Sequence, residues 1–125
     1  MKSEPLQLNY EFSRVYKRGQ RFYGKYVLLH IFKRDSRVYK GRVRIPDDIN
    51  RIGVTASKKV RTAVLRNRMR RLLRESYRTH EPFIKTGYDM ILMIRDPEAV
   101  PTFSLLHEDI KHLLRKAGVM ERDAL

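Results

Sequence analysis

The sequence contains no cysteine and no apolar stretch long enough to cross a membrane. The lack of cysteine excludes disulfides and thiolate metal sites, and it allows a reducing compartment. A membrane span needs roughly 18 or more apolar residues. The first twelve residues include Lys2 and Glu4 and lack the continuous apolar segment of a secretory signal. We therefore expect a cytoplasmic protein that has no membrane partner.

Acidic residues are also scarce. The chain has 28 Lys and Arg against 14 Asp and Glu, which gives a formal net charge of +14 over 125 residues. A charge of this size steers association with nucleic acid. A hydrophobic content of 42%, with seven Tyr and five Phe, argues against a disordered basic tail. The length allows one domain with one modest core.

Residue groups that carry independent catalysis are few. The histidines are dispersed and lack the spacing of metal ligands: His30, His80, His107 and His112. Two acidic pairs lie beside prolines and are typical of turns rather than of a two-metal carboxylate cluster: Asp47 with Asp48, and Asp96 with Glu98. No Gly-rich phosphate loop followed by Lys and Ser/Thr occurs. We expect no catalytic and no metal-binding residue in the protein.

Residues 57–74 contain eight Lys or Arg and no acid, with apolar residues at helical spacing. At about 100° per residue, this pattern predicts a helix from about residue 61 to 79 that stops before Pro82. One face is apolar and should pack on the core: Leu65, Met69, Leu72 and Leu73, with Ser76 beside them. The other face carries the arginines.

Four of those arginines follow one another at i,i+4 spacing: Arg66, Arg70, Arg74 and Arg78. Like charges at this spacing cost about 0.3 kcal/mol per pair, and a merely solvated face would interleave acids. Arginine also suits phosphate, because its planar fork can hold two phosphate oxygens and can stack on bases. The pattern favours a nucleic-acid-binding face over a solvated one.

The remaining elements are read from periodicity and capping residues. Asn9 is a candidate N-cap of a short helix that ends near Gly19. Thr102 is a candidate N-cap of the last helix, which Gly118 ends. Strands are expected at residues 25–33, 51–56 and 88–95, and residues 37–44 form a basic, extended and protruding connection.

The segment from Ile52 to Glu75 resembles the defining segment of the bacterial ribonuclease P protein subunit. The resemblance is carried by the pair Lys58-Lys59, by Ala63, by Arg66-Asn67-Arg68 and by Arg70-Arg71. It continues in the opening helix with Asn9, Phe12, Tyr16 and Gly19, in the strand at 88–95 and in the closing residues 112–118. The termini and one loop lie outside it.

The resemblance implies an α/β fold, a small single-domain sandwich of order αβββαβα with a left-handed βαβ crossover. Residues 37–44 would then be the middle strand. Residues 9–118 would form the RNA-binding domain, with residues 1–8 as an N-terminal extension and residues 119–125 as a C-terminal tail.

The implied function is that of the protein subunit of ribonuclease P. Such a subunit binds the catalytic RNA and the 5′ leader of precursor tRNA, and it assists magnesium-dependent endonucleolytic removal of the leader. The holoenzyme is an endoribonuclease in which the RNA is the catalyst. Mg²⁺ is expected to be bound mainly by the RNA, because this ion favours phosphate oxygens and retained water. The expected partners are that RNA and the leader, with no stable protein partner.

The resemblance also implies two sets of site residues. The residues expected to contact the catalytic RNA are Lys58, Lys59, Arg61, Arg66, Asn67, Arg68, Arg70, Arg71 and Arg74. Those expected to line a cleft for the leader are Phe12, Tyr16, Lys17, Leu29 and Thr55. Aromatic rings there would stack on unpaired bases of any identity. Leu29 replaces an aromatic residue of the family, so stacking from that strand could come from Tyr26 or His30.

Three alternatives stay open at this point. Phe12, Val15 and Tyr16 have the spacing of an ordinary buried stripe. The connection at 35–50 is long and basic, and it either adds RNA contacts or is simply solvated: Arg37, Lys40, Arg42 and Arg44. A structural RNA-binding protein of ribosomal type would explain charge and core equally well, but not the motif spacing. A helix for anionic membranes is disfavoured, because the domain needs its apolar face.

Overall fold

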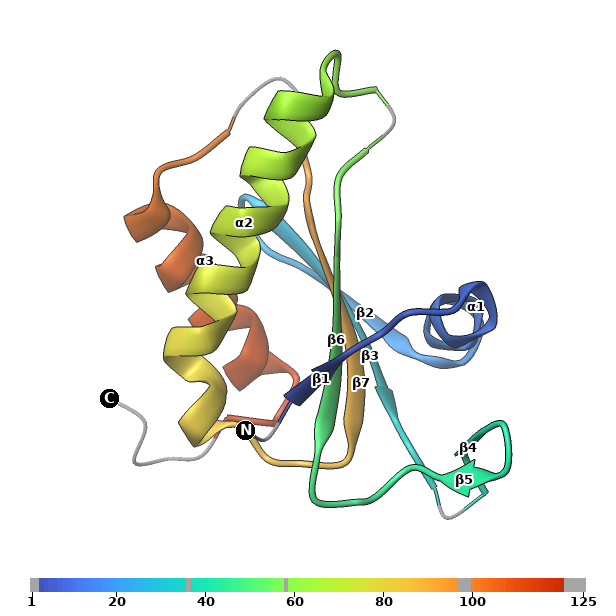
Figure 1. Cartoon of the computed structure of the whole chain (residues 1–125). Helices are drawn as coiled ribbons and strands as arrows, with labels where there is room; N and C mark the ends of the chain where they lie inside the picture. Colours follow the sequence, from blue (N-terminus) through green and yellow to red (C-terminus); the bar gives the residue numbers. More distant parts are fainter. Residues whose placement is uncertain (1–2, 36, 58, 97–99, 121–125) are drawn as a thin grey trace.

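The computed structural model describes residues 3–35, 37–57, 59–96 and 100–120. The elements follow the order β1 (Ser3–Pro5), α1 (Asn9–Arg18), β2 (Gln20–Tyr23), β3 (Val27–Lys33), β4 (Tyr39–Lys40), β5 (Val43–Arg44), β6 (Asn50–Thr55), α2 (Ala63–His80), a 3-10 helix (Glu81–Phe83), β7 (Tyr88–Ile94) and α3 (Phe103–Lys116). Five strands form one sheet of order β1-β6-β7-β3-β2. Helices α2 and α3 cover one face of this sheet, and α1 lies on the other (Figure 1).

Helix α1 has the predicted length but a different N-terminal cap. Asn9 is its first helical residue rather than the cap. The side chain of Glu11 turns back instead, and its Oε1 accepts hydrogen bonds from the backbone N–H of Leu8 at 2.9 Å and of Gln7 at 3.2 Å. The helix ends at Gly19 as predicted, where a Cβ atom would lie only 2.5 Å from the carbonyl oxygen of Val15.

Helix α2 confirms the predicted amphipathic pattern. Thr62 caps it, because its hydroxyl accepts a hydrogen bond from the N–H of Leu65 at 3.1 Å. Met69, Leu73 and Ser76 are buried, and the other predicted core positions, Leu65 and Leu72, are partly buried. Thr102 caps α3 in the same way, and Gly118 follows α3 with a positive φ of 77°. The two capping predictions for α3 are therefore confirmed.

The order αβββαβα is present, but its strands differ from the prediction. Residues 37–44 are not the middle strand, because Tyr39–Lys40 and Val43–Arg44 pair with each other in a separate hairpin. Val38 and Ile45, on either side of this hairpin, are buried in a small cluster on the α1 side of the sheet. The strand that completes the order is β2, whose four residues, two polar followed by two aromatic, have no period-2 alternation. It pairs antiparallel with β3.

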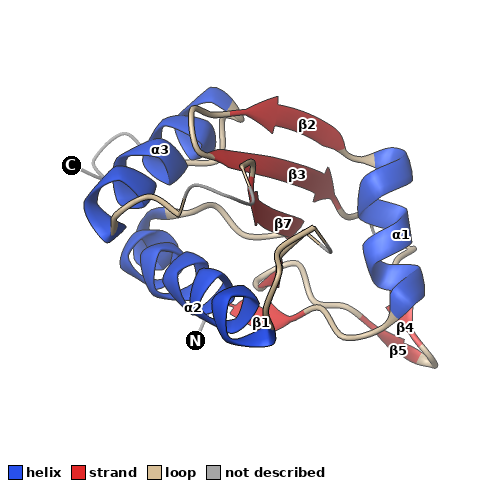
Figure 2. Ribbon diagram, turned by 90° about the horizontal axis from the view of Figure 1, so that it is seen from above, coloured by secondary structure: helices blue, strands red, loops and turns tan. Residues whose placement is uncertain are grey.

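Strands β6 and β7 are parallel neighbours connected through α2. Figures 1 and 2 show that this crossover is left-handed. About 98% of such connections are right-handed, so this crossover is a distinctive property of the fold. It places the start of α2 beside the end of β6.

The folded domain is wider than residues 9–118. Strand β1 pairs in parallel with the lower half of β6, and the Ser3 Oγ lies 2.7 Å from the hydroxyl of Tyr77 in a buried hydrogen bond. At the other end, Val119 and Met120 are buried in the main core. Parts of the predicted extension and tail therefore belong to the domain.

A buried ionic cluster lies under α1. Arg51 donates from Nε to Asp89 Oδ1 at 2.9 Å and from Nη2 to Asp89 Oδ2 at 2.7 Å, and its Nη1 donates to Glu11. Arg34 donates from Nη1 to the same Asp89 at 2.7 Å and from Nη2 to the carbonyl oxygens of Pro46 and Ile49. These bonds connect α1, β6, β7 and the loop after β5.

Candidate nucleic-acid interface

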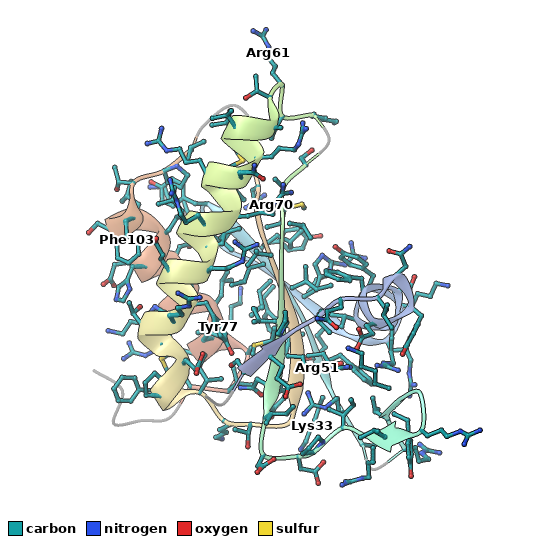
Figure 3. All side chains as sticks on the ribbon, in the orientation of Figure 1. Lys33, Arg51, Arg61, Arg70, Tyr77 and Phe103 are labelled. Carbon is teal, nitrogen blue, oxygen red and sulfur yellow. The ribbon has the colours of Figure 1, made fainter. Side chains whose placement is uncertain are left out.

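The solvent face of α2 carries a cluster of positive charge. Arg68, Arg71, Arg74 and Arg78 are exposed, and Lys59 and Arg61 are exposed in the loop that leads into the helix. Figure 3 shows Arg61 at the far end of that loop and Arg70 on the upper half of α2. Within the described ranges, no arginine of α2 forms an ion pair. A shallow hollow on this face is lined by Asn67, Arg68, Arg70, Arg71, Arg74 and Val64. We call these exposed cations and the hollow the α2 basic face.

Two arginines of the motif also have structural contacts. Arg66 is half-buried, and its Nη1 donates to the carbonyl oxygen of Val60 at 2.8 Å. Arg70 donates from Nη2 to the Asn67 Oδ1 at 2.8 Å, which orients both side chains on the helix. The first bond fixes the loop before α2, and the second orders the hollow. Lys58, also predicted to contact RNA, lies outside the described residues.

On the opposite face of the sheet, strand register brings four side chains into one row. Thr55 pairs with Met93, Met93 with Leu28, and Leu28 with Tyr23, so the row crosses β6, β7, β3 and β2. Residues paired in this way point to the same side of a sheet. Among the described residues, α1 is the helix on this side of the sheet (Figure 1), and it leaves Leu28, Thr55 and Met93 half-buried and Tyr23 exposed. We call this uncovered area the α1-side platform.

Tyr16 of α1 lies at the border of the platform. Tyr16 is 44% exposed, and its ring meets the His30 ring edge-on, with 4.7 Å between the centroids. Burial raises the pKa of the Tyr16 hydroxyl, and the Thr55 side chain partly opposes the shift. Burial, and then the charge of Arg21, lower the pKa of His30. The imidazole is therefore neutral at pH 7, and because it is buried it packs against the Tyr16 ring without adding a charge.

Leu29 was predicted to line the cleft, and this is wrong. Its side chain is fully buried in the core under α2 and α3. Successive side chains of a strand point to opposite faces, so His30, one position further, is the residue that reaches Tyr16. Of the two substitutes considered, His30 is on the platform side, whereas Tyr26 packs against the core. Because β3 is apolar at nearly every position, its sequence does not show which side chains point to which face of the sheet.

The other predicted cleft residues differ in their exposure. Phe12 is half-buried and packs so closely on Gly53 that a Cβ atom there would lie 2.6 Å from its ring carbon Cε1. Phe12 is thus mainly a packing residue. Lys17 is exposed, and Thr55 is half-buried in the platform row. Sequence reasoning missed Tyr23, Leu28 and Met93, which only the register of β2 and β7 could place.

The basic connection at 35–50 is partly neutralised by its own acids. Arg37 forms an ion pair with Asp35 at 3.1 Å, and Arg44 forms one with Asp47 at 3.1 Å. Lys40 donates from Nζ to Gln7 Oε1 at 2.6 Å. The positive charge of the connection is therefore much less available than that of the α2 basic face. A contact between the connection and RNA stays a prediction.

The described residues contain no group of three or more His, Asp or Glu that could hold a metal ion. The buried carboxylates of Glu11 and Asp89 are bound by arginines. Within the same described residues, no helix is both long and apolar enough to cross a membrane.

A small α/β domain with an exposed arginine face and an aromatic platform has the surfaces of an RNA-binding protein. Comparison with known proteins identifies the family within this class. Residues 1–118 match the family model described as Ribonuclease P. The chain is 36% identical over 123 residues to the ribonuclease P protein component of Clostridium acetobutylicum, covering 98% of this chain and 96% of that protein. It is 34% identical over 118 residues to that of Clostridium novyi, covering 94% and 96%.

Solved structures agree. The RNase P protein of Staphylococcus aureus superposes with a TM-score of 0.73 at 26% identity, covering 94% of this chain and 97% of that one. The Thermotoga maritima RNase P protein has a TM-score of 0.73 at 23% identity, covering 89% and 97%, and shares the fold. This chain belongs to the ribonuclease P protein family. It is thus a protein component of a ribonuclease that processes tRNA, and its partner is the RNA subunit.

Proposed function

We propose that this protein binds the catalytic RNA through the α2 basic face and the 5′ leader of precursor tRNA through the α1-side platform. It thereby assists removal of the leader to form the mature 5′ end. The RNA subunit is the catalyst, and the protein supplies no reacting group. The holoenzyme acts in the cytoplasm.

The α2 basic face suits a structured RNA. Exposed guanidinium groups at i,i+4 spacing repel one another when the protein is free. A row of phosphates relieves that repulsion and releases counterions, so binding is strong and depends on salt. The bonds from Arg70 to Asn67 and from Arg66 to Val60 orient part of this face before RNA arrives. Preorganised donors lose less conformational entropy on binding.

The platform suits unpaired nucleotides. The observation that carries this assignment is the exposed Tyr16 ring, which stands edge-on to His30 beside an uncovered sheet surface. Stacking on aromatic rings tolerates every base, which an enzyme that processes many different leaders requires. The buried, neutral His30 supports the Tyr16 ring through their edge-on contact and places no charge at that point.

Magnesium fits the RNA better than the protein. Glu11 and Asp89 are already bound by Arg51 and Arg34, which leaves them poorly suited to a cation. Mg²⁺ prefers phosphate oxygens and retained water, and in the holoenzyme it supplies the charge stabilisation for hydrolysis. The protein lowers the magnesium requirement by neutralising phosphates of its RNA partner.

Reconstitution tests the function. A bacterial ribonuclease P RNA is assayed for precursor tRNA cleavage at low magnesium, with and without this protein. Rescue of cleavage at the mature 5′ end is expected. A structural RNA-binding protein of ribosomal type would bind RNA without rescuing cleavage, and that outcome would contradict the proposal.

A second experiment tests the leader site through Tyr16→Leu. The substitution keeps much of the buried volume and removes stacking worth roughly 1 to 3 kcal/mol per base. The mutant holoenzyme should bind precursor tRNA more weakly and mature tRNA unchanged. Tyr10→Leu, an exposed tyrosine elsewhere on α1, is the matched control and should behave as the wild type. Equal losses for both tRNAs would instead indicate a folding defect.

A further inference from the structure

Tyr23 stands at the far end of the platform row. Its side chain is 53% exposed and pairs across the sheet with Leu28, on the side opposite the core that holds its neighbour Phe22. The guanidinium of Arg95, which follows β7, lies over the Tyr23 ring at 5.4 Å from its centroid. An exposed aromatic ring and an arginine are thus held together on the same face as Tyr16 and His30.

This corner of the molecule is fixed by several hydrogen bonds. Arg95 donates from Nη1 to the carbonyl oxygen of Gly24 at 2.6 Å. Behind the ring, the buried carboxylate of Asp109 on α3 accepts three backbone N–H bonds from Lys25, Tyr26 and Val27 at 2.8 to 2.9 Å. Gly24 is needed for this approach, because a Cβ atom there would lie 2.5 Å from Asp109 Oδ2. The turn that carries Tyr23 is therefore anchored on α3.

We propose that Tyr23 and Arg95 form a second stacking subsite for single-stranded RNA, distinct from the Tyr16–His30 position. This inference rests on the proposed function of the platform. The Tyr23 ring takes an unpaired base on its exposed area, and Arg95 meets the adjoining phosphate. A guanidinium has five N–H donors, so the bond to Gly24 leaves donors for a phosphate oxygen. Arginine also contributes to stacking through its own planar group.

The position of the subsite determines which leader nucleotides it binds. The platform row begins at Thr55, the last residue of β6, next to the loop that leads into the α2 basic face. Tyr23 lies three strands away on β2, the edge strand. Strand spacing of about 4.8 Å places the two ends of the row about 14 Å apart. The α2 end faces the catalytic RNA, so Tyr23 receives nucleotides remote from the cleavage site.

The test uses the reconstituted holoenzyme and precursor tRNAs whose leaders increase one nucleotide at a time. For the wild type, affinity should rise as the leader grows and rise again when it reaches Tyr23. Tyr23→Ala should remove only the last increment, a loss of about fivefold or more for long leaders and none for short ones. Tyr23→Phe should retain it. Tyr39→Ala, which removes a similarly exposed tyrosine from the β4–β5 hairpin, is the matched control.

The outcomes separate the two proposals. If the wild-type holoenzyme shows no dependence on leader length, the proposed leader site itself is wrong. If length dependence is present and Tyr23→Ala leaves it intact, only the second subsite is overturned. A loss that is equal at all lengths also overturns it, because that pattern reports folding rather than stacking. A photoreactive residue at position 23 should crosslink to remote leader nucleotides, and crosslinking to those next to the cleavage site would contradict the orientation.

Discussion

Two sets of arginines in this protein have opposite environments. Arg34 and Arg51 are buried under α1, and the carboxylates of Asp89 and Glu11 bind them. The exposed arginines of α2 form no ion pair among the described residues. The chain has only half as many acidic residues as basic ones, so acidic partners are scarce. The buried carboxylates of Asp89 and Glu11 are thus used to compensate buried cations, whereas that of Asp109 accepts backbone N–H bonds. The contrast shows that one residue type stabilises the fold in one region and leaves charge for RNA in the other.

The largest effect should come from Arg51→Ala. Removing one partner of a buried ionic cluster leaves uncompensated charge and typically costs about 3 to 5 kcal/mol. The free energy of unfolding, measured by urea denaturation, should fall by about that amount. Arg71→Ala, on the exposed face, is the control and should leave stability unchanged. If Arg51→Ala were as stable as the control, the division into two sets would be wrong.

Arg66→Ala sharpens the comparison, because Arg66 belongs to both sets. Its bond to the carbonyl oxygen of Val60 predicts a loss of about 1 kcal/mol in stability. Its place in the α2 motif predicts weaker binding to the catalytic RNA as well. Denaturation and an RNA-binding titration on the same protein check both. A variant with normal stability but weaker binding would show that the bond to Val60 is not structural.

The smallest effect is on the pH dependence of stability, and it comes from histidines that are buried in the neutral form. Burial lowers the pKa of His80, and the hydrogen bond to the backbone of His107 opposes it. The charges of His107 and Lys111 lower the pKa further, and that of Glu108 raises it. The unfolded chain binds a proton near pH 6.5, whereas the folded protein does so only at lower pH. Stability should therefore be full above pH 6.5 and fall as pH drops below it, by at most about 1.4 kcal/mol per pH unit for each such histidine.

His80→Gln removes this titration while keeping a side-chain donor for the carbonyl oxygen of His107. Denaturation at several pH values should show a flatter profile for the variant. His30, whose pKa is also lowered, accounts for the part that persists. An unaltered profile would mean that folding does not lower the pKa of His80.

The sequence was sufficient for α2 and α3, because apolar periodicity located both helices and Thr102 was predicted as the cap of α3; the cap of α2, Thr62, was found only in the structure. The sequence also predicted the α2 basic face, because helical spacing alone places Arg71 on the solvent side of α2 and Leu73 on the core side. The platform was harder to predict. The row of side chains depends on the register of β6, β7, β3 and β2, and β2 and β7 are far apart in the chain. In addition, the nearly uninterrupted apolar run in β3 does not reveal which residue faces α1. Leu29 was assigned to the cleft from the resemblance to the family, and the apolar run offered no pattern that could correct the assignment by one position.

The buried cluster was not predictable from local patterns. Glu11 and Asp89 are 78 positions apart, and only the pairing of β6 with β7 brings Arg51 beside them. Strand β1 and the β4–β5 hairpin are equally non-local, because their stability comes from the edge of β6 and from the small core under α1.

The salt dependence of binding to the catalytic RNA tests the central claim most directly. Each phosphate neutralised contributes roughly 0.7 to 0.9 to the slope of log affinity against log salt. A variant with Arg68→Gln, Arg71→Gln and Arg74→Gln should fold normally, because these side chains are exposed. Its slope should be shallower than that of the wild type by about 2 to 3. An unchanged slope in a fully folded variant would contradict the assignment of this face to RNA.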